Sequence, residues 1–91
     1  MTGPSLADFA PGEAWSVTAG DACHRLRLNS AEQLVDTGRE GGAFRLEFLG
    51  PSGPLLAQAI YRFEREGAAH EIFIVPIARD AEGVRYEAIF G

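Results

Sequence analysis

The chain has 91 residues and a formal net charge of −5, which results from thirteen acidic residues against eight arginines and no lysine. A chain of this length forms one domain, residues 1–91, whose folding buries roughly 60 to 65% of the surface that the extended chain exposes. The negative charge argues against nucleic acid and anionic membranes as partners, because both are bound mainly through lysine and arginine.

The N-terminal residues carry neither the basic nor the apolar region of a secretion signal. The longest apolar run, residues 72–78, is far shorter than the ~20 residues of a membrane helix. The sequence therefore predicts a cytoplasmic protein, which an assembled particle can later incorporate. The single cysteine, Cys23, excludes an internal disulfide, so stability has to come from the core, to which association can add.

The first part of the chain predicts a short helical turn followed by a hairpin. Leu6 and Phe9 are three residues apart, which places both on one side of a helical turn that begins near Ser5. Apolar and polar residues then alternate over residues 15–28, with a turn at residues 19–21 between the two strands.

The rest of the chain predicts further strands, separated by turns rich in glycine and proline. Residues 29–36 fit a continuation of the second strand past a bulge, and residues 37–42 fit a loop. Alternation then predicts strands at residues 43–49, 58–65, 70–78 and 84–90. The predicted fold class is all-β, a small barrel or two-sheet sandwich of about six antiparallel strands with a short N-terminal helical turn.

The last two predicted strands form an antiparallel hairpin with two different faces. A five-residue loop at residues 79–83, with Gly83 at a positive φ, would place Ala78 opposite Val84 and Pro76 opposite Tyr86. One face is then the core, and it consists of Ile72, Ile74, Pro76, Val84, Tyr86, Ala88 and Phe90. The other face carries four large apolar side chains, which are Phe73, Val75, Ile77 and Ile89.

Two explanations for this outward stripe remain open at the level of sequence. The N-terminal turn, with Leu6 and Phe9, or the long loop can fold over it, or a protein partner can bury it. A change of register by one residue would turn Ile72 and Ile74 outward instead, so an apolar stripe remains in either register. The stripe is therefore the candidate interface.

The reactive side chains form no motif of catalysis or metal binding. Cys23 and His24 are adjacent, and neighbouring side chains on a strand point to opposite faces, so they cannot act as a nucleophile and base pair. His24 and His70 lack the close spacing of metal ligands. We predict no catalytic residue, no metal and no cofactor, and we expect Cys23 to be a small packed side chain.

Aromatic residues allow an alternative in which the protein binds a small ligand. A barrel with Trp15, Tyr61, His70 and Tyr86 around its mouth could accept a small or carbohydrate-like molecule. Trp15 and Tyr86 would otherwise close the ends of the β core.

Four motifs in the second half resemble a family of small bacterial domains of unknown function. They are F-x-L-x-F-x-G-P from Phe44, Q-x-x-Y-x-F from Gln58, I-F-x-V-P-I from Ile72 and Y-E-A-x-F from Tyr86. The resemblance covers residues 44–90 and implies a single compact unit. Some members of this family are encoded near tail-fibre or collar-type proteins of phage-like particles. The resemblance implies no catalytic residue for this chain.

These observations favour a non-enzymatic structural or adaptor module. Such a module would associate with itself or with a larger assembly, for example a phage-tail-like particle, through the stripe at residues 72–77. The ligand-binding barrel is the alternative, and an enzyme that uses Cys23 or the histidines is the third hypothesis.

Overall fold

The fold is known from a computed structural model that describes residues 5–34 and 43–90. It has one short 3-10 helix and six strands: η1 (Leu6–Asp8), β1 (Ala14–Ala19), β2 (Ala22–Gln33), β3 (Phe44–Gly50), β4 (Ala59–Arg65), β5 (Ala68–Asp80) and β6 (Gly83–Phe90). The loop predicted at residues 37–42 lies outside the described residues. None of the helices found in the described ranges is long and apolar enough to cross a membrane.

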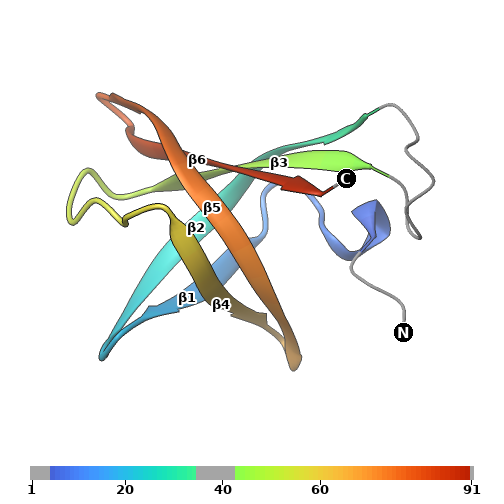
Figure 1. The fold of residues 1–91 in the computed structure, drawn as a ribbon, viewed down its shortest axis with the longest axis horizontal. Coiled ribbons are helices and arrows are strands. Elements are labelled where there is room, and N and C mark those ends of the chain that lie inside the picture. Colours follow the sequence, from blue (N-terminus) through green and yellow to red (C-terminus); the bar gives the residue numbers. More distant parts are fainter. Residues whose placement is uncertain (1–4, 35–42, 91) are drawn as a thin grey trace.

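The six strands close into a barrel in the order β1-β2-β3-β6-β5-β4, and all neighbouring pairs are antiparallel. β1 and β4 complete the ring, with Val17 opposite Phe63. β2 and β5 are three strands apart in this ring, so they lie on opposite sides of the barrel, and β5 crosses in front of β2 in Figure 1. The all-β prediction is confirmed, and of its two forms the barrel is the one observed.

Inward side chains fill the barrel because successive residues of a strand point to opposite faces. On β3, Phe44, Leu46 and Phe48 are buried, while the residues between them are only partly covered. Phe48 meets Phe63 of β4 at 4.8 Å between ring centroids, although β3 and β4 are opposite strands of the ring. Aromatic rings therefore occupy the centre of the interior.

The predicted N-terminal turn is confirmed, and it closes one end of the barrel. The Ser5 backbone N–H donates to the Asp8 carboxylate at 2.8 Å, which holds the turn together. Phe9 follows the turn and is buried, with its ring 5.5 Å from Trp15 and 6.0 Å from Phe44. Figure 1 shows η1 at the end of the barrel where β6 finishes.

The other end of the barrel is closed by residues 51–58. Leu56 of this segment is buried, and its backbone N–H donates to the Tyr86 hydroxyl at 2.9 Å. Gly50 permits this packing, since a Cβ at that position would overlap the Leu26 side chain. Both ends of the barrel are thus occupied by parts of the chain itself.

The predicted strands of the second half are confirmed, and β5 is longer at both ends than the sequence suggested. β2 continues to Gln33, and its pairing with β3 shifts between Leu28 and Ser30, which confirms the bulge expected in this stretch.

The register of the last hairpin is confirmed in its middle and is wrong near the turn. Pro76 lies opposite Tyr86 as predicted, but Asp80 pairs with Gly83, so that the loop has two residues instead of five. A bulge at Ile77 absorbs the difference. Asp80 explains the tight turn, because its carboxylate accepts the backbone N–H of Glu82 at 2.9 Å. Gly83 has a φ of +138°, which confirms the predicted positive value.

Candidate functional site

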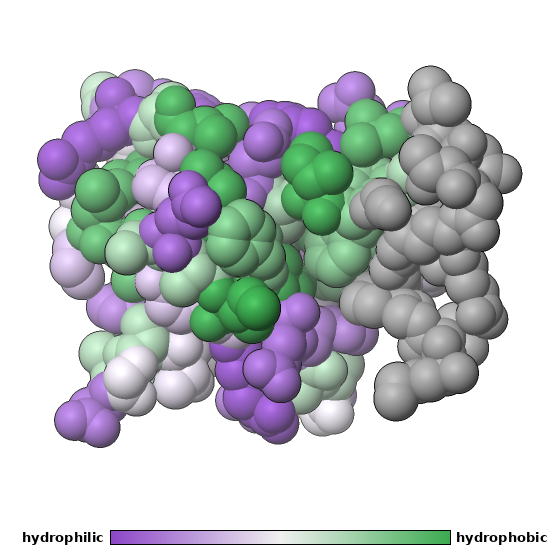
Figure 2. All heavy atoms as spheres, viewed as in Figure 1, coloured by the Kyte–Doolittle hydropathy of each residue, from purple (hydrophilic) through white to green (hydrophobic). Residues whose placement is uncertain are grey.

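The strongest candidate site is an apolar patch on the outer surface of β4, β5 and β6. Ile60, Phe73, Ile77 and Ile89 are exposed, with 63%, 49%, 44% and 56% of their surface accessible. Val75 is half-buried beside them on β5. Hydrophobic residues gather over these strands on the face that Figure 2 draws. We call the surface formed by these five residues the apolar face.

Strand pairing brings the residues of the apolar face together. Ile60 on β4 lies directly opposite Phe73 on β5, and Val75 lies opposite Glu87 on β6. Facing residues in an antiparallel pair have Cβ atoms about 5 Å apart, close enough for their side chains to touch. The patch therefore crosses strands, whereas the predicted stripe followed the 70–90 hairpin alone.

The structure places all four predicted interface residues on the outside and adds Ile60, which the predicted interface did not include. The alternation that carries Arg62 and Glu64 outward on β4 also carries Ile60 outward, so the signal was present in the sequence. An isoleucine at an outward position of this strand was the sequence feature that could have predicted its place in the apolar face.

The N-terminal turn does not cover the apolar face. Phe9 is buried at the end of the barrel, and Leu6 packs against the same core. The sequence left two segments of the chain that could cover the predicted stripe. The prediction that the N-terminal turn covers it is wrong, and the loop at residues 37–42 lies outside the described residues. Within the described part of the chain, the apolar face remains open to solvent.

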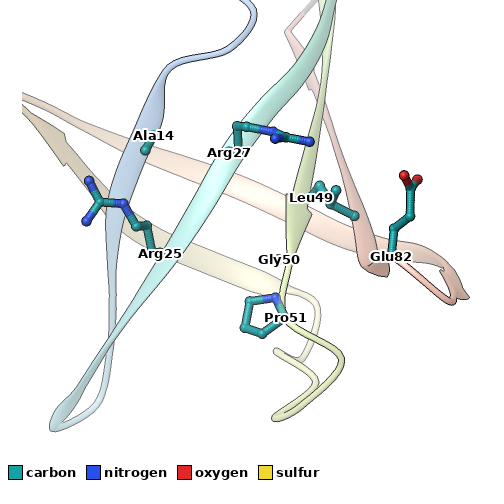
Figure 3. Close-up of a pocket in the computed structure, with 7 residues that line it drawn as sticks. All are labelled: Ala14, Arg25, Arg27, Leu49, Gly50, Pro51 and Glu82. Atoms are coloured by element: carbon teal, nitrogen blue, oxygen red, sulfur yellow. The ribbon is translucent and has the colours of Figure 1, made fainter.

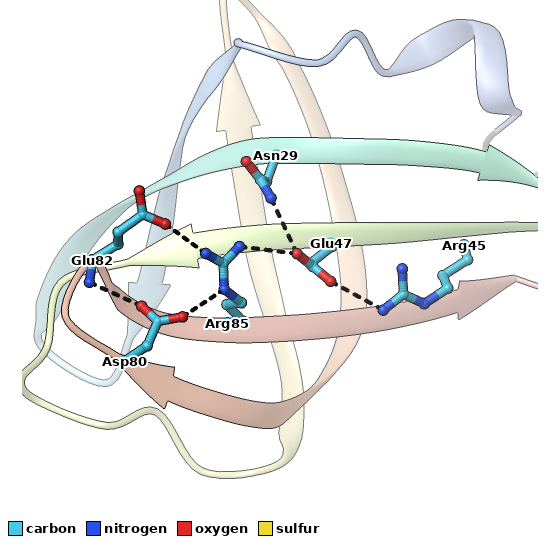
Figure 4. A network of polar contacts seen from close by, with 6 residues as sticks. All are labelled: Asn29, Arg45, Glu47, Asp80, Glu82 and Arg85. Carbon is cyan, nitrogen blue, oxygen red and sulfur yellow. Dashed lines mark hydrogen bonds and ion pairs between the residues drawn. The ribbon is translucent and has the colours of Figure 1, made fainter.

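A network of charged side chains covers the neighbouring surface over β3 and β6 (Figure 4). Arg45 donates to Glu87 at 2.6 Å and to Glu47 at 3.2 Å, and Arg85 also bonds Glu47 at 3.2 Å. Arg85 further binds Asp80 and Glu82 of the hairpin turn, at 2.9 and 2.6 Å. We call this group of side chains, with Asn29, the charged network.

The charged network lowers the pKa of two of its carboxylates, Glu47 and Asp80. The hydrogen bond from Asn29 and those from Arg45 and Arg85 lower the pKa of Glu47 below its ordinary value. Arg85 has the same effect on the pKa of Asp80. A general acid needs the opposite shift, a raised pKa.

The four residues of the predicted ligand mouth do not surround one opening. Trp15 and His70 come together at the end that Phe9 closes, with ring centroids 5.8 Å apart. Tyr86 is buried, and its hydroxyl binds the segment that closes the other end. Tyr61 donates its hydroxyl to the Ala57 carbonyl at 2.7 Å. A hollow of about 250 Å³ includes Trp15 of the four, together with Asp8, Glu13, Arg65, Glu66 and Ala68.

The reactive residues remain apart. Cys23 is exposed, which corrects the expectation of a packed side chain, and its neighbour His24 is partly buried on the opposite face of β2. His70 packs its ring against Phe9 at 5.3 Å. No group of three or more histidine, cysteine or acidic side chains that could hold a metal occurs in the described ranges.

The fold and its surfaces define the class of this protein as a small, closed antiparallel barrel with a filled interior and differentiated outer faces. The chain belongs to the family described as domain of unknown function DUF6916, whose model matches residues 4–90. The predicted membership of a family of unknown function is thereby confirmed, and the match extends beyond residues 44–90 to nearly the whole chain. No curated protein and no solved structure matches the chain.

Proposed function

We propose that this domain is a non-enzymatic interaction module that buries its apolar face against a second copy of the same chain. The observation that carries the proposal is the accessibility of Ile60, Phe73 and Ile89, large apolar side chains on three adjacent strands. Contiguous apolar surface of this kind commonly marks an interaction site in a small protein.

Charges at the border of the apolar face favour a second copy as the occupant. Arg62 and Glu71 lie directly opposite each other on β4 and β5, beside the Ile60 and Phe73 pair. A two-fold axis that runs parallel to the strands between β4 and β5 would bring Arg62 of one copy over Glu71 of the other. Face-to-face packing is the expected geometry, because a closed barrel offers no free edge for sheet extension.

The expected association is weak. Burial of one large apolar side chain contributes roughly 1.5 to 3 kcal/mol, and the side chains of this face are already about half covered. Eight of them, four from each copy, therefore supply roughly 6 to 12 kcal/mol, and association costs at least about 4 kcal/mol. The remainder, roughly 2 to 8 kcal/mol, corresponds to dissociation constants from about micromolar to weaker than millimolar. A larger assembly that presents many copies would strengthen such contacts through avidity. A phage-tail-like particle, which the sequence resemblance implied, is an assembly of this type.

Sedimentation velocity over a range of concentrations tests the proposal. We expect the wild-type chain to show a concentration-dependent dimer and Phe73→Glu to remain monomeric with an unchanged circular dichroism spectrum. Cys23→Glu is the matched control and should dimerise like wild type, since Cys23 is an exposed residue of β2, on the opposite side of the ring from β5. A wild-type chain that stays monomeric at millimolar concentration would refute self-association and assign the apolar face to a different subunit.

The alternative of a ligand-binding barrel has less support. A ligand inside the barrel would compete with Phe48 and Phe63, whose rings meet across the interior. Phe9 and Leu56 also occupy its two ends. Co-purification from the native cell, with protein and small-molecule mass spectrometry of the eluate, separates a subunit from a ligand.

A further inference from the structure

A second surface with its own chemistry lies on the opposite side of the barrel from the apolar face. It is a hollow of about 570 Å³ over β2 and β3, and its lining includes Ala14, Arg25, Arg27, Leu49, Pro51 and Glu82 (Figure 3). The volume is within the range of roughly 300 to 1,000 Å³ that ligand pockets in proteins show. Because β2 is opposite β5 in the ring, an occupant here would not touch the apolar face.

Arg25 and Arg27 differ from the other arginines in the described ranges, since neither has a hydrogen bond or an ion pair there. The remaining described arginines are engaged: Arg45, Arg62, Arg65 and Arg85 in ion pairs, and Arg79 with the Ser52 carbonyl. The chain has thirteen acidic residues, yet these two outward guanidinium groups have no acidic partner. Their N–H donors are therefore available to bind the carboxylates of another molecule.

The strand geometry of β2 sets the spacing of these two cations. Arg25 and Arg27 are two residues apart on one strand, so they share a face and their Cα atoms are roughly 6.5 to 7 Å apart. Their neighbours across β1 are Ser16 and Ala14, which are too small to cover the guanidiniums. Figure 3 shows the Arg27 side chain extended toward Leu49 of β3 and the Arg25 side chain on the β1 side.

We propose that this hollow binds an acidic segment of a partner protein in an extended conformation. An extended peptide repeats its side chains on one face at the same spacing of two residues, so alternate aspartates or glutamates can meet Arg25 and Arg27. Leu49 and Pro51 supply apolar surface for the side chains between them. Glu82 also lines the hollow, but its carboxylate pairs with Arg85 at 2.6 Å and not with Arg25 or Arg27.

Protein carboxylates fit this surface better than the phosphates of a nucleic acid do. Affinity for nucleic acid grows with the number of cations that replace counterions, and this surface has two on a chain of net charge −5. Two spaced guanidiniums with apolar contacts between them match a peptide with separated carboxylates.

Fluorescence polarisation with a labelled peptide, in which glutamate alternates with valine, tests this site on the wild-type chain. We expect saturable binding that weakens as salt is added, and an isosteric peptide with glutamine in place of glutamate should not bind. Arg25→Gln combined with Arg27→Gln should lower the affinity about tenfold or more. Arg62→Gln combined with Arg65→Gln, which removes the same two charges on β4, is the matched control and should change the affinity less than twofold.

Further measurements distinguish the acidic-peptide site from non-specific binding, from a nucleic-acid site and from the proposed dimer interface. Phe73→Glu should bind the acidic peptide like wild type, because the two surfaces lie on opposite sides. An equal loss of affinity in the Arg62→Gln, Arg65→Gln control would show non-specific charge attraction and overturn the site. Competition by free glutarate at the concentration of the peptide, or tighter binding of a labelled single-stranded RNA, would overturn the assignment to a protein segment.

Discussion

Two adjoining outer surfaces of the barrel differ in how far their side chains find partners within the chain. One lies over β3 and β6, and the other lies over β4 and β5. On the first surface, Glu47 accepts hydrogen bonds from Asn29, Arg45 and Arg85, and the charged groups satisfy one another. On the second, Ile60 and Phe73 meet each other and remain exposed.

The difference shows that outward residues of a barrel fall into two kinds. Those of the charged network complete their interactions within the chain, so the chain alone accounts for them. The side chains of the apolar face contribute a favourable free energy only when another molecule buries them away from water. The second kind of surface is therefore the one expected to bind a partner. Variants on the two surfaces should differ in their effect on the stability of the single chain.

The largest effect is expected from a side chain at Gly83, which sits beneath the charged network where β6 starts. A Cβ at Gly83 would overlap the backbone carbonyl of Gly50 on β3, and φ is +138°. Gly83→Ala should therefore destabilise the chain by roughly 2 to 4 kcal/mol in urea unfolding, from strain and overpacking together. Gly67→Ala is the control, because Gly67 also has a positive φ of 85° but open space around it. It should cost roughly 1 kcal/mol, and equal costs at the two positions would contradict a close approach of β3 and β6.

A smaller effect is expected from Glu47→Gln, which removes the charge at the centre of the network. We expect a loss of roughly 1 to 2 kcal/mol, because two arginines lose an ionised acceptor that is largely shielded from water. Urea unfolding at neutral pH measures the loss. An unchanged midpoint would show that the network contributes no stability.

The same variant also predicts a pH dependence. The pKa of Glu47 is lowered in the folded chain, so its contribution is complete above the ordinary carboxyl range near pH 4.5 and is lost as pH falls through the lowered pKa. The difference in stability between wild type and Glu47→Gln should therefore shrink below about pH 4.5. A difference that grows with acid would contradict the assigned direction.

The smallest effect is expected from Phe73→Thr on the apolar face. The side chain is exposed in the single chain, and threonine keeps a high strand propensity, so the monomer should lose less than about 1 kcal/mol. Thermal unfolding at dilute concentration measures the monomer alone. A loss as large as that of a core phenylalanine would show that part of the chain covers the face and would remove the contrast between the two surfaces.

Alternation along each strand was sufficient to predict most of this protein. The pattern at residues 44–48 assigned its apolar side chains to the core, and the pattern at residues 72–75 assigned Phe73 and Val75 to the outside. Both results follow from the two-residue period of a strand, which is a local property of the backbone. The positive φ at Gly83 was predicted in the same way, from turn chemistry between adjacent strands.

The features that escaped prediction depend on contacts between residues far apart in the chain. Closure of the barrel rests on the pairing of β1 with β4, and the charged network joins Asn29 and Arg45 to residues of the last hairpin. The bulge at Ile77 was missed because two hairpin loops of different length fit the same residues. The hydrogen bonds that the Asp80 carboxylate accepts from Glu82 and Arg85 favour the shorter loop.

The sequence by itself therefore determined which side chains point inward and which point outward, because that choice is made residue by residue along a strand. Only the tertiary structure decided what each outward side chain meets. Ring order brings Ile60 to Phe73 and puts Arg25 and Arg27 on the opposite side of the barrel. Ring order depends on which strands pair, and pairing reflects the free energy of the whole barrel and not the pattern of any single strand.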